Sequence, residues 1–110
     1  MKVMISQPMR DKTDEQIREE RATLVAQLEK EGYEVVDSIF QDEPPTDVKN
    51  KGAWYLAKSI ELMSKVDAVV FMKEWVTSRG CRAEHYIAEE YEIFMRSEHT
   101  DCYLHQLLNK

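Results

Sequence analysis

Residues 67–72 read DAVVFM, an apolar run that is continuous rather than alternating. A short continuous run of this kind is typical of a central strand that is covered on both faces of a parallel sheet. Outward from it, the runs KVMIS (2–6), YEVVD (33–37) and EIFMR (92–96) predict three further strands. The chain is therefore organised around strands, with longer segments between them.

The segments between the strands carry helix signals. TDEQ (13–16) has the pattern of a capping box, and Gly32 stands where a helix that starts there would end. Further helices are expected over 53–65 and 83–91. Strands that alternate with helices predict a parallel sheet with right-handed crossovers. We expect an α/β chain with a single-domain, three-layer Rossmann-like or flavodoxin-like fold and a four- to five-stranded, mostly parallel sheet.

Length and charge narrow the possible functions. With 110 residues the chain is long enough for one core, which we place at residues 1–96, followed by a polar C-terminal segment at 97–110. The formal charge of −6 argues against binding of a nucleic-acid polymer, although a small anion can be held by a few local cations and amides. No run approaches a membrane span and no export signal is visible, so we expect no membrane partner and a cytoplasmic location. Cys81 and Cys102 are then expected to be free thiols.

The segment EWVTSRGCRAEH (74–85) follows the central strand directly. In open parallel sheets, ligands bind beyond the carboxyl ends of the strands, and this segment leads away from that edge. We expect Glu84 at the start of the third helix, where free amides and the helix dipole favour a carboxylate or a bound anion. Gly80 would allow close approach to a ligand, and Ser78 with Arg79 could hold a phosphate. The plainer interpretation is that Glu84 only complements the helix dipole.

Three segments resemble the nucleoside 2-deoxyribosyltransferase-like superfamily, and especially its small members. They are KVMISQPMR (2–10), WYLAKSIELMSKVDAVVF (54–71) and SRGCRAEH (78–85), and the likeness covers roughly residues 1–95. The resemblance implies that Glu84 attacks C1′ of a 2′-deoxynucleoside or its 5′-monophosphate and forms a covalent deoxyribosyl intermediate. Ser78 stands at the position that contacts phosphate in the monophosphate hydrolases. The implied substrate-binding residues are Ser6, Gln7, Pro8, Met9, Arg10, Ser59, Ser78, Arg79 and Gly80.

The chain departs from the pattern of that superfamily at three positions. Met4 stands where many members have a tyrosine that orients the nucleophile, and Gln7 stands where many have glycine. Ser59 occupies the position of an aspartate that helps to hold substrate. A second carboxylate would then have to come from elsewhere, and the candidates are Glu61, Glu74 and Asp37.

Two smaller constellations have both a chemical and an ordinary structural interpretation. Cys81 and His85 are four residues apart on a predicted helix and could form a thiolate pair, although no third orienting residue is evident. The C-terminal segment holds half of a possible zinc site and lacks a fourth ligand. That half-site consists of His99, Cys102 and His105. Neither constellation displaces Glu84, so no metal and no cofactor are expected.

The leading hypothesis is cleavage or exchange of the N-glycosidic bond of 2′-deoxynucleoside 5′-monophosphates through Glu84, with a small deoxynucleotide or nucleoside as the partner. The alternatives are a non-catalytic nucleotide-binding or sensor module on the same fold, and an interaction protein that uses its acidic surface. A homodimer or larger homo-oligomer is expected, since the second helix has more apolar residues than one inward face readily absorbs. These residues are Trp54, Tyr55, Leu62 and Met63.

Overall fold

The computed structural model describes residues 1–40 and 42–97. Within them, four strands alternate with three α-helices and one short 3-10 helix. In chain order the elements are β1 (Lys2–Ser6), α1 (Asp14–Lys30), β2 (Glu34–Val36), α2 (Lys51–Met63), β3 (Ala68–Phe71), η1 (Trp75–Thr77), α3 (Arg79–Glu90) and β4 (Phe94–Ser97). The predicted residues His99, Cys102 and His105, and most of the polar C-terminal segment, lie outside the described residues.

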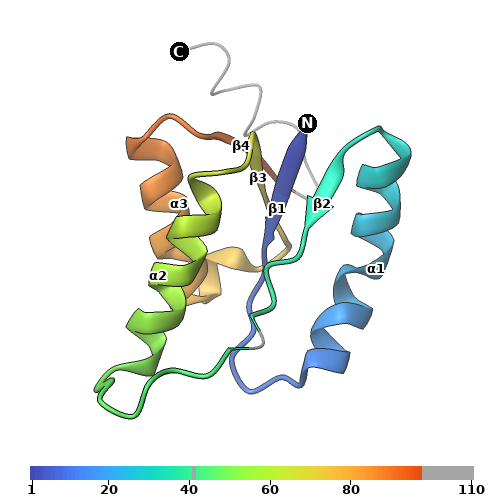
Figure 1. Cartoon of the computed structure of the whole chain (residues 1–110). Helices are drawn as coiled ribbons and strands as arrows, with labels where there is room; N and C mark the ends of the chain where they lie inside the picture. The colour runs from blue at the N-terminus through green and yellow to red at the C-terminus, as the bar shows by residue number, and fades with distance from the viewer. Residues whose placement is uncertain (41, 98–110) are drawn as a thin grey trace.

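The strands form one parallel sheet in the order β2-β1-β3-β4 (Figure 1). Met4 in β1 pairs with Val36 on one side and with Val69 on the other, so β1 is central. The α/β class and the parallel sheet are thus confirmed, and the order is that of the first four strands of a flavodoxin-like domain. The chain moves outward from β1 to β2 and then crosses to β3, so the strand order reverses between β1 and β3. Ligands of such sheets bind beside this reversal, at the carboxyl ends of the strands.

Helices cover the sheet from both sides, with α1 on one face and α2 and α3 together on the other (Figure 1). Alternation along the strands sends successive side chains to opposite faces and divides the core into two clusters. The α1 side holds Val3, Ile5, Leu24, Leu28, Val70 and Met72. The other side holds Met4, Met63, Val69, Phe71, Ala88 and Met95. Each large apolar side chain that is fully buried contributes about 1.5–3 kcal/mol, so these clusters hold the layers together.

Helix α1 begins and ends as its sequence predicts. Thr13 is the N-cap and forms a capping box with Gln16, in which each side chain accepts from the backbone of the other. After the helix, Gly32 adopts φ 95°, a left-handed conformation that favours glycine. The buried stripe of α1 includes Ile17 and Leu24 and, between them, Arg21. A charged residue therefore lies in the middle of an otherwise apolar helix face.

The prediction for the start of α3 was wrong by four residues. Helix α3 begins at Arg79 rather than Ala83, because the Ser78 side chain accepts a hydrogen bond from the backbone N–H of Cys81 at 3.3 Å. Gly80 is therefore helical instead of part of a loop. Glu84 lies in the second turn, away from the free amides, so the helix dipole at the N-terminus does not account for its position.

The apolar surface predicted on α2 is largely used inside the chain. Met63 is 1% exposed, and Leu62 packs against the same core cluster. The Tyr55 hydroxyl donates to the backbone carbonyl of Asp42, at 3.5 Å. Trp54 lies edge-on to Tyr55 and carries the Lys58 ammonium 5.2 Å from its ring centre. Among the helices of the described residues, none is long and apolar enough to cross a membrane.

Candidate functional site

Glu84 of α3 meets Ser6, the last residue of β1, at the point where the strand order reverses. The Ser6 hydroxyl donates to Glu84 Oε1 over 3.3 Å. Both side chains are buried, with 1% of Ser6 and 8% of Glu84 exposed. The sequence separation of this pair is 78 residues. The fold thus brings a carboxylate to the edge where ligands of parallel sheets bind.

Burial controls the ionisation of Glu84. Desolvation raises the pKa of this carboxyl from 4.5 to about 7, and the hydrogen bond from Ser6 works in the opposite direction. The carboxyl group is therefore poised between its neutral and ionised forms near neutral pH. Acids and nucleophiles of active sites are often tuned in this way, and a buried carboxylate in an edge site is a functional candidate on physical grounds.

Cys81 and Ser78 extend this buried polar cluster toward the start of α3. Burial raises the pKa of the Cys81 thiol, while hydrogen bonds with Ser6 and Ser78 lower it and the charge of Glu84 raises it. The thiol therefore stays neutral at neutral pH and bridges the two serines. We refer to Ser6, Ser78, Cys81 and Glu84 as the edge cluster. Ser78 and Glu84 were predicted site residues, and the structure connects them through Ser6 and Cys81.

Arg79 and Gly80 lie in the first turn of α3, beside the first turn of α2. A Cβ added at Gly52 of α2 would lie 3.3 Å from Nη2 of Arg79, so the guanidinium group packs over that glycine. A Cβ added at Gly80 would meet only the Ser78 hydroxyl, at 4.0 Å, so the space beside Gly80 is open. Arg79 is exposed. Both residues therefore lie next to Ser78, at the border of the edge cluster.

Of the residues that follow β1, one is bonded to α1 and the others lie in the loop beyond. The Gln7 amide is buried against α1, where its Nε2 donates to the Ile17 carbonyl at 3.0 Å and its Oε1 accepts from Arg21 at 2.8 Å. The Gln7 side chain is therefore committed to α1, and only its backbone faces the edge. Pro8 and Met9 are half-buried and Arg10 is exposed in the loop beyond.

A second buried polar group lies on the opposite side of β1. Arg21 is 4% exposed and, besides its bond to Gln7, donates from Nη2 to Ser38 at 3.2 Å. The Ser38 hydroxyl donates in turn to the Ile5 carbonyl at 2.9 Å. We refer to Gln7, Arg21 and Ser38 as the arginine network. Sequence reasoning missed it, although the spacing of Arg21 from Ile17 and Leu24 places it on the apolar face of α1.

The candidates for a second carboxylate do not reach Glu84. Asp37 pairs with Arg18 at 3.1 Å and caps the Ile39 amide. Glu61 pairs with Lys65 on the surface of α2, at 3.6 Å. The third candidate, Glu74, is exposed with φ 67°. Ser59, the predicted substrate-binding residue that stands in place of an aspartate, is half-buried on α2. No hydrogen bond or ion pair in residues 1–40 and 42–97 joins any of these four to Glu84.

His85 faces a different environment from its neighbour Glu84. Its ring stacks on Trp75 with 4.2 Å between ring centres and 7° between planes, and it also lies 5.1 Å from Phe71. Burial lowers the pKa of His85, against a raising effect of Glu89. The Cys81 thiol, in contrast, bonds with Ser6 and Ser78 in the edge cluster. Cys81 and His85, the two residues of the possible thiolate pair, thus have different partners.

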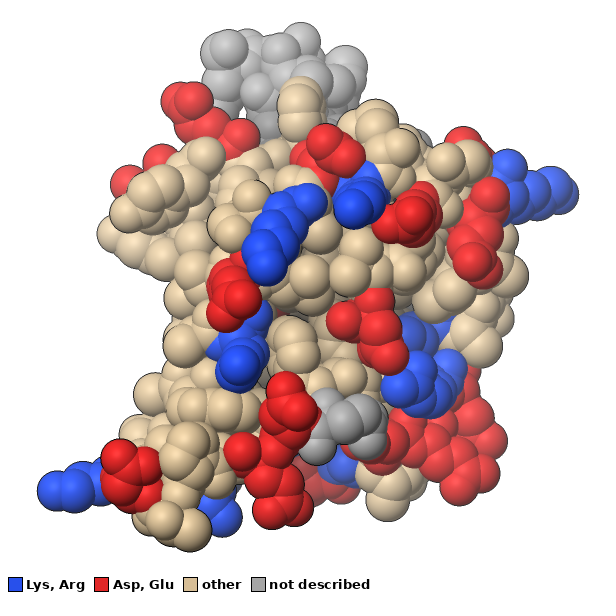
Figure 2. Space-filling view, viewed as in Figure 1, with Lys and Arg blue, Asp and Glu red and all other residues tan. Residues whose placement is uncertain are grey.

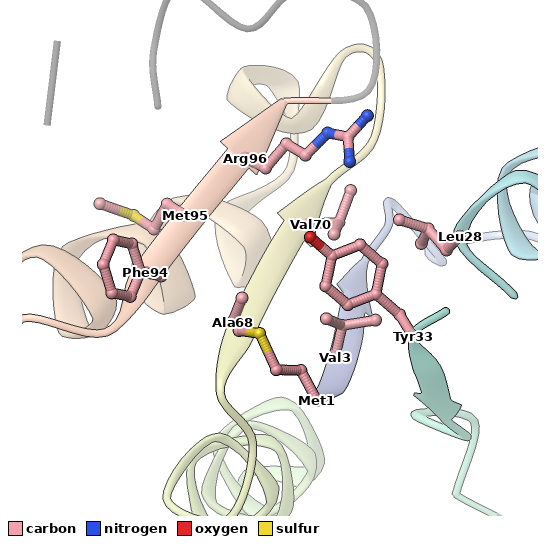
Figure 3. Close-up of a pocket in the computed structure, with 9 residues that line it drawn as sticks. All are labelled: Met1, Val3, Leu28, Tyr33, Ala68, Val70, Phe94, Met95 and Arg96. Atoms are coloured by element: carbon pink, nitrogen blue, oxygen red, sulfur yellow. The ribbon is translucent and has the colours of Figure 1, made fainter. Parts of the chain in front are cut away.

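A separate, partly open hollow lies on the α1 side of the sheet, toward the amino ends of the strands (Figure 3). Its lining is mostly apolar, and Tyr33 and Arg96 extend over it in the close-up. Arg96 reaches across to Glu31, with Nη1 at 2.8 Å from Oε2. The lining residues are Met1, Val3, Leu28, Tyr33, Ala68, Val70, Phe94, Met95 and Arg96. This hollow is remote from the carboxyl edge, and none of the described residues that line it carries a carboxylate.

Within the described ranges, the surface charge and the distribution of metal-binding side chains point to no other site. On the face shown in Figure 2, acidic and basic side chains are interspersed, without a broad basic surface of the kind that binds nucleic acid. In the described part of the chain, no group of three or more His, Cys, Asp or Glu side chains is arranged to hold a metal ion. Among the described residues, the edge cluster is therefore the group of side chains best suited to catalysis or ligand binding.

The fold and the edge cluster define a small parallel α/β domain with a buried carboxylate at the strand reversal. By sequence, the chain belongs to the family described as a domain of unknown function (DUF4406), which matches residues 1–96. No curated protein and no solved structure is matched by the chain.

Proposed function

We propose that the protein cleaves or exchanges the N-glycosidic bond of 2′-deoxynucleoside 5′-monophosphates, with Glu84 as the nucleophile. The observation that carries the proposal is the buried Glu84 carboxyl group, fixed by Ser6 at the strand reversal. The resemblance to the nucleoside 2-deoxyribosyltransferase-like superfamily supports the same role for Glu84. A buried, oriented carboxylate is suited to attack on an anomeric carbon.

The proposed chemistry has two steps. In the first, the ionised Glu84 oxygen forms a bond to C1′ while the bond from C1′ to the base nitrogen breaks, and the base leaves with the electron pair and takes up a proton. In the second, a water oxygen attacks C1′, loses a proton and releases Glu84, giving the sugar phosphate. A second base in place of water gives exchange. The raised pKa of Glu84 means that the reactive, ionised form increases as the pH passes through about 7.

Ser78 supports a preference for the 5′-monophosphate. As the N-cap of α3, its oxygen accepts from the Cys81 amide, and its hydroxyl, which also hydrogen-bonds with the Cys81 thiol, can turn to donate to an anion. The first turn of α3, with open space beside Gly80, presents backbone N–H groups in the same region. Arg79, exposed next to Ser78, adds a positive charge that can approach a phosphate.

A second candidate is a non-catalytic nucleotide-binding module. One observation favours it, namely that no second carboxylate in the described residues contacts Glu84. A binding module would retain affinity for the monophosphate and release no base. The two candidates therefore differ in a single measurable product.

The deciding experiment is incubation of the protein with each of the four deoxynucleoside monophosphates, followed by chromatography for free base. Release of base at a rate proportional to protein concentration supports the enzyme. Calorimetry on the same four compounds is run in parallel. Binding without release of base would establish the module instead, and absence of both would refute the proposal.

A homodimer or larger homo-oligomer, with sites completed by a neighbouring chain, is a further part of the proposal and rests on the resemblance. Because Met63 and Leu62 pack in the core, Trp54 and Tyr55 are the two residues of the predicted apolar set that α2 can still offer to a second copy. Light scattering at micromolar concentration tests it. A monomer of 13.0 kDa that still releases base would rule out shared sites.

A further inference from the structure

The environment of Glu84 assigns a role to Ser6 that differs from substrate contact. We propose that Ser6 is a positioning residue, whose hydroxyl holds the Glu84 carboxylate in place and favours its ionised form. This inference rests on the proposed function for its catalytic meaning, but the contact itself is independent of any substrate. The resemblance placed Ser6 only among residues that touch the ligand.

The geometry leaves Ser6 little freedom for another task. Its side chain is 1% exposed and donates to Glu84 Oε1 over 3.3 Å. A serine hydroxyl has one hydrogen to donate, and in this structure the carboxylate receives it. The Ser6 backbone is equally committed, since its carbonyl accepts from the Met72 amide at 2.9 Å. The Ser6 hydroxyl can therefore donate to a ligand only if it gives up Glu84.

Strand geometry explains why this hydroxyl, and no other group of β1, reaches Glu84. Side chains two residues apart on a strand point to the same face, so Met4 and Ser6 both face α3 while Ile5 faces α1. Met4 is part of the apolar cluster and has no hydrogen-bond donor in its side chain. Ser6, one step closer to the carboxyl edge, is the polar end of that row.

The other groups near Glu84 do not take over this role. From α3 itself, Cys81 bonds with the two serines, and because burial raises its pKa it remains a neutral thiol. Arg82 acts on Cys81 electrostatically and is exposed. Besides desolvation, the hydrogen bond from Ser6 is the influence that acts on the ionisation of Glu84, and it favours the carboxylate.

Ser38 provides a matched control. It is also a buried serine beside the end of β1, with 3% of its surface exposed, and its hydroxyl is hydrogen-bonded to Ile5 and Arg21. It lies on the α1 side of the sheet and does not contact Glu84. Loss of either hydroxyl removes a buried hydrogen bond, but only loss of Ser6 should change the carboxylate.

The test is an NMR titration of the Glu84 side-chain carboxyl carbon in the ligand-free, full-length protein, with the signal assigned from Glu84→Gln. Ser6→Ala should move the titration midpoint upward by about one pH unit, a tenfold change in the ionisation equilibrium. Ser38→Ala should leave the midpoint within about 0.2 pH units, because its effect is confined to stability. Ser6→Thr, which keeps the hydroxyl, should restore a midpoint close to that of the unaltered protein.

An unchanged midpoint in folded Ser6→Ala, or equal shifts in Ser6→Ala and Ser38→Ala, would overturn the assignment. If Ser6→Ala does not fold, Ser6→Cys replaces it, and its weaker donor should give a smaller upward shift. Because no substrate is present, the result is separable from the proposed function. A shifted midpoint without release of base would keep Ser6 in its role and refute the enzyme. If base is released, the pH profile of kcat/KM should shift upward with the midpoint while KM stays within about twofold.

Discussion

Two buried charged residues flank the central strand, and their surroundings differ. On the α1 side, Arg21 donates to Gln7 and Ser38, both of which are themselves bonded further into the protein. On the α3 side, Glu84 accepts one hydrogen bond, from Ser6 at 3.3 Å. A carboxylate has two oxygens and room for several donors, so Glu84 keeps acceptor capacity for a ligand.

This difference favours a structural role for Arg21 and the proposed functional role for Glu84. Buried polar groups that serve the fold are closed into complete hydrogen-bond networks, because each unsatisfied group costs about 1–3 kcal/mol. A buried carboxyl with spare acceptor capacity destabilises the protein unless a ligand or a reaction uses it. The arginine network therefore fits a structural role, and the edge cluster fits the role of the proposed site.

The largest expected effect is on turnover. Glu84→Gln keeps the shape of the side chain and removes the nucleophilic oxygen, so base release from a deoxynucleoside monophosphate should fall at least about a thousandfold. The measurement is the initial rate by chromatography. Glu90→Gln is the matched control, since Glu90 is exposed on the same helix and should retain full activity. Rates in Glu84→Gln that equal those of the unaltered protein would exclude Glu84 as the nucleophile.

The next effect is on stability and concerns the arginine network. Arg21→Met keeps the apolar stem but leaves Gln7 Oε1 and the Ser38 hydroxyl without this partner, so the free energy of unfolding should fall by about 3 kcal/mol. Urea unfolding measures it. In the control, Arg18→Met breaks an exposed ion pair with Asp37 and should cost less than about 1 kcal/mol. Similar losses in the two variants would mean that Arg21 is not the structural centre proposed here.

Replacement of Glu84 should increase the free energy of unfolding, whereas replacement of Arg21 should decrease it. Its pKa is about 7 in the folded protein and near 4.5 when unfolded, so the folded state binds the proton more tightly. The contribution of Glu84 to stability is then greatest below about pH 4.5 and is lost as the pH rises through about 7. At pH 8, Glu84→Gln should raise the free energy of unfolding by about 3 kcal/mol, and near pH 4.5 by little. A variant that is destabilised equally at both pH values would show that Glu84 serves the fold.

The smallest expected effect concerns Ser78. Ser78→Ala should weaken the affinity for a deoxynucleoside monophosphate about tenfold and leave the affinity for the nucleoside unchanged. Calorimetry with both ligands measures this, and the difference between them removes the contribution of the lost helix cap. Equal losses for the two ligands would reduce Ser78 to its capping role.

Much of the fold could be predicted because its signals are local. The capping box at Thr13 and Gln16, the glycine at position 32 and the apolar run at 67–72 each act within a few residues. The start of α3 was missed because serine is common in loops as well as at helix N-caps, and because glycine, here Gly80 in the first turn, is typical of a loop. A helix can tolerate such a glycine at a cost of about 1 kcal/mol.

The candidate site was less accessible to prediction because it depends on contacts between distant segments. Glu84 could be singled out, but its partner Ser6 belongs to another element 78 residues away. Arg21 was overlooked because arginine on a helix is usually exposed, and the buried partners Gln7 and Ser38 come from two different loops. Burial of a charge is a property of the assembled layers, which local patterns do not encode.

The sequence separation between Ser6 and Glu84 also has a consequence for folding. The unit from β1 to β2 is formed from neighbouring segments, whereas the edge cluster requires β3 and α3 to dock on a strand made at the very start of the chain. Closure of such a long loop is slow and comes with the non-local part of the fold. A chain that has emerged only as far as β3 lacks Glu84, and a chain whose α3 has opened has a solvated Glu84 without Ser6 beside it. The proposed chemistry at this edge is thus restricted to the completed domain.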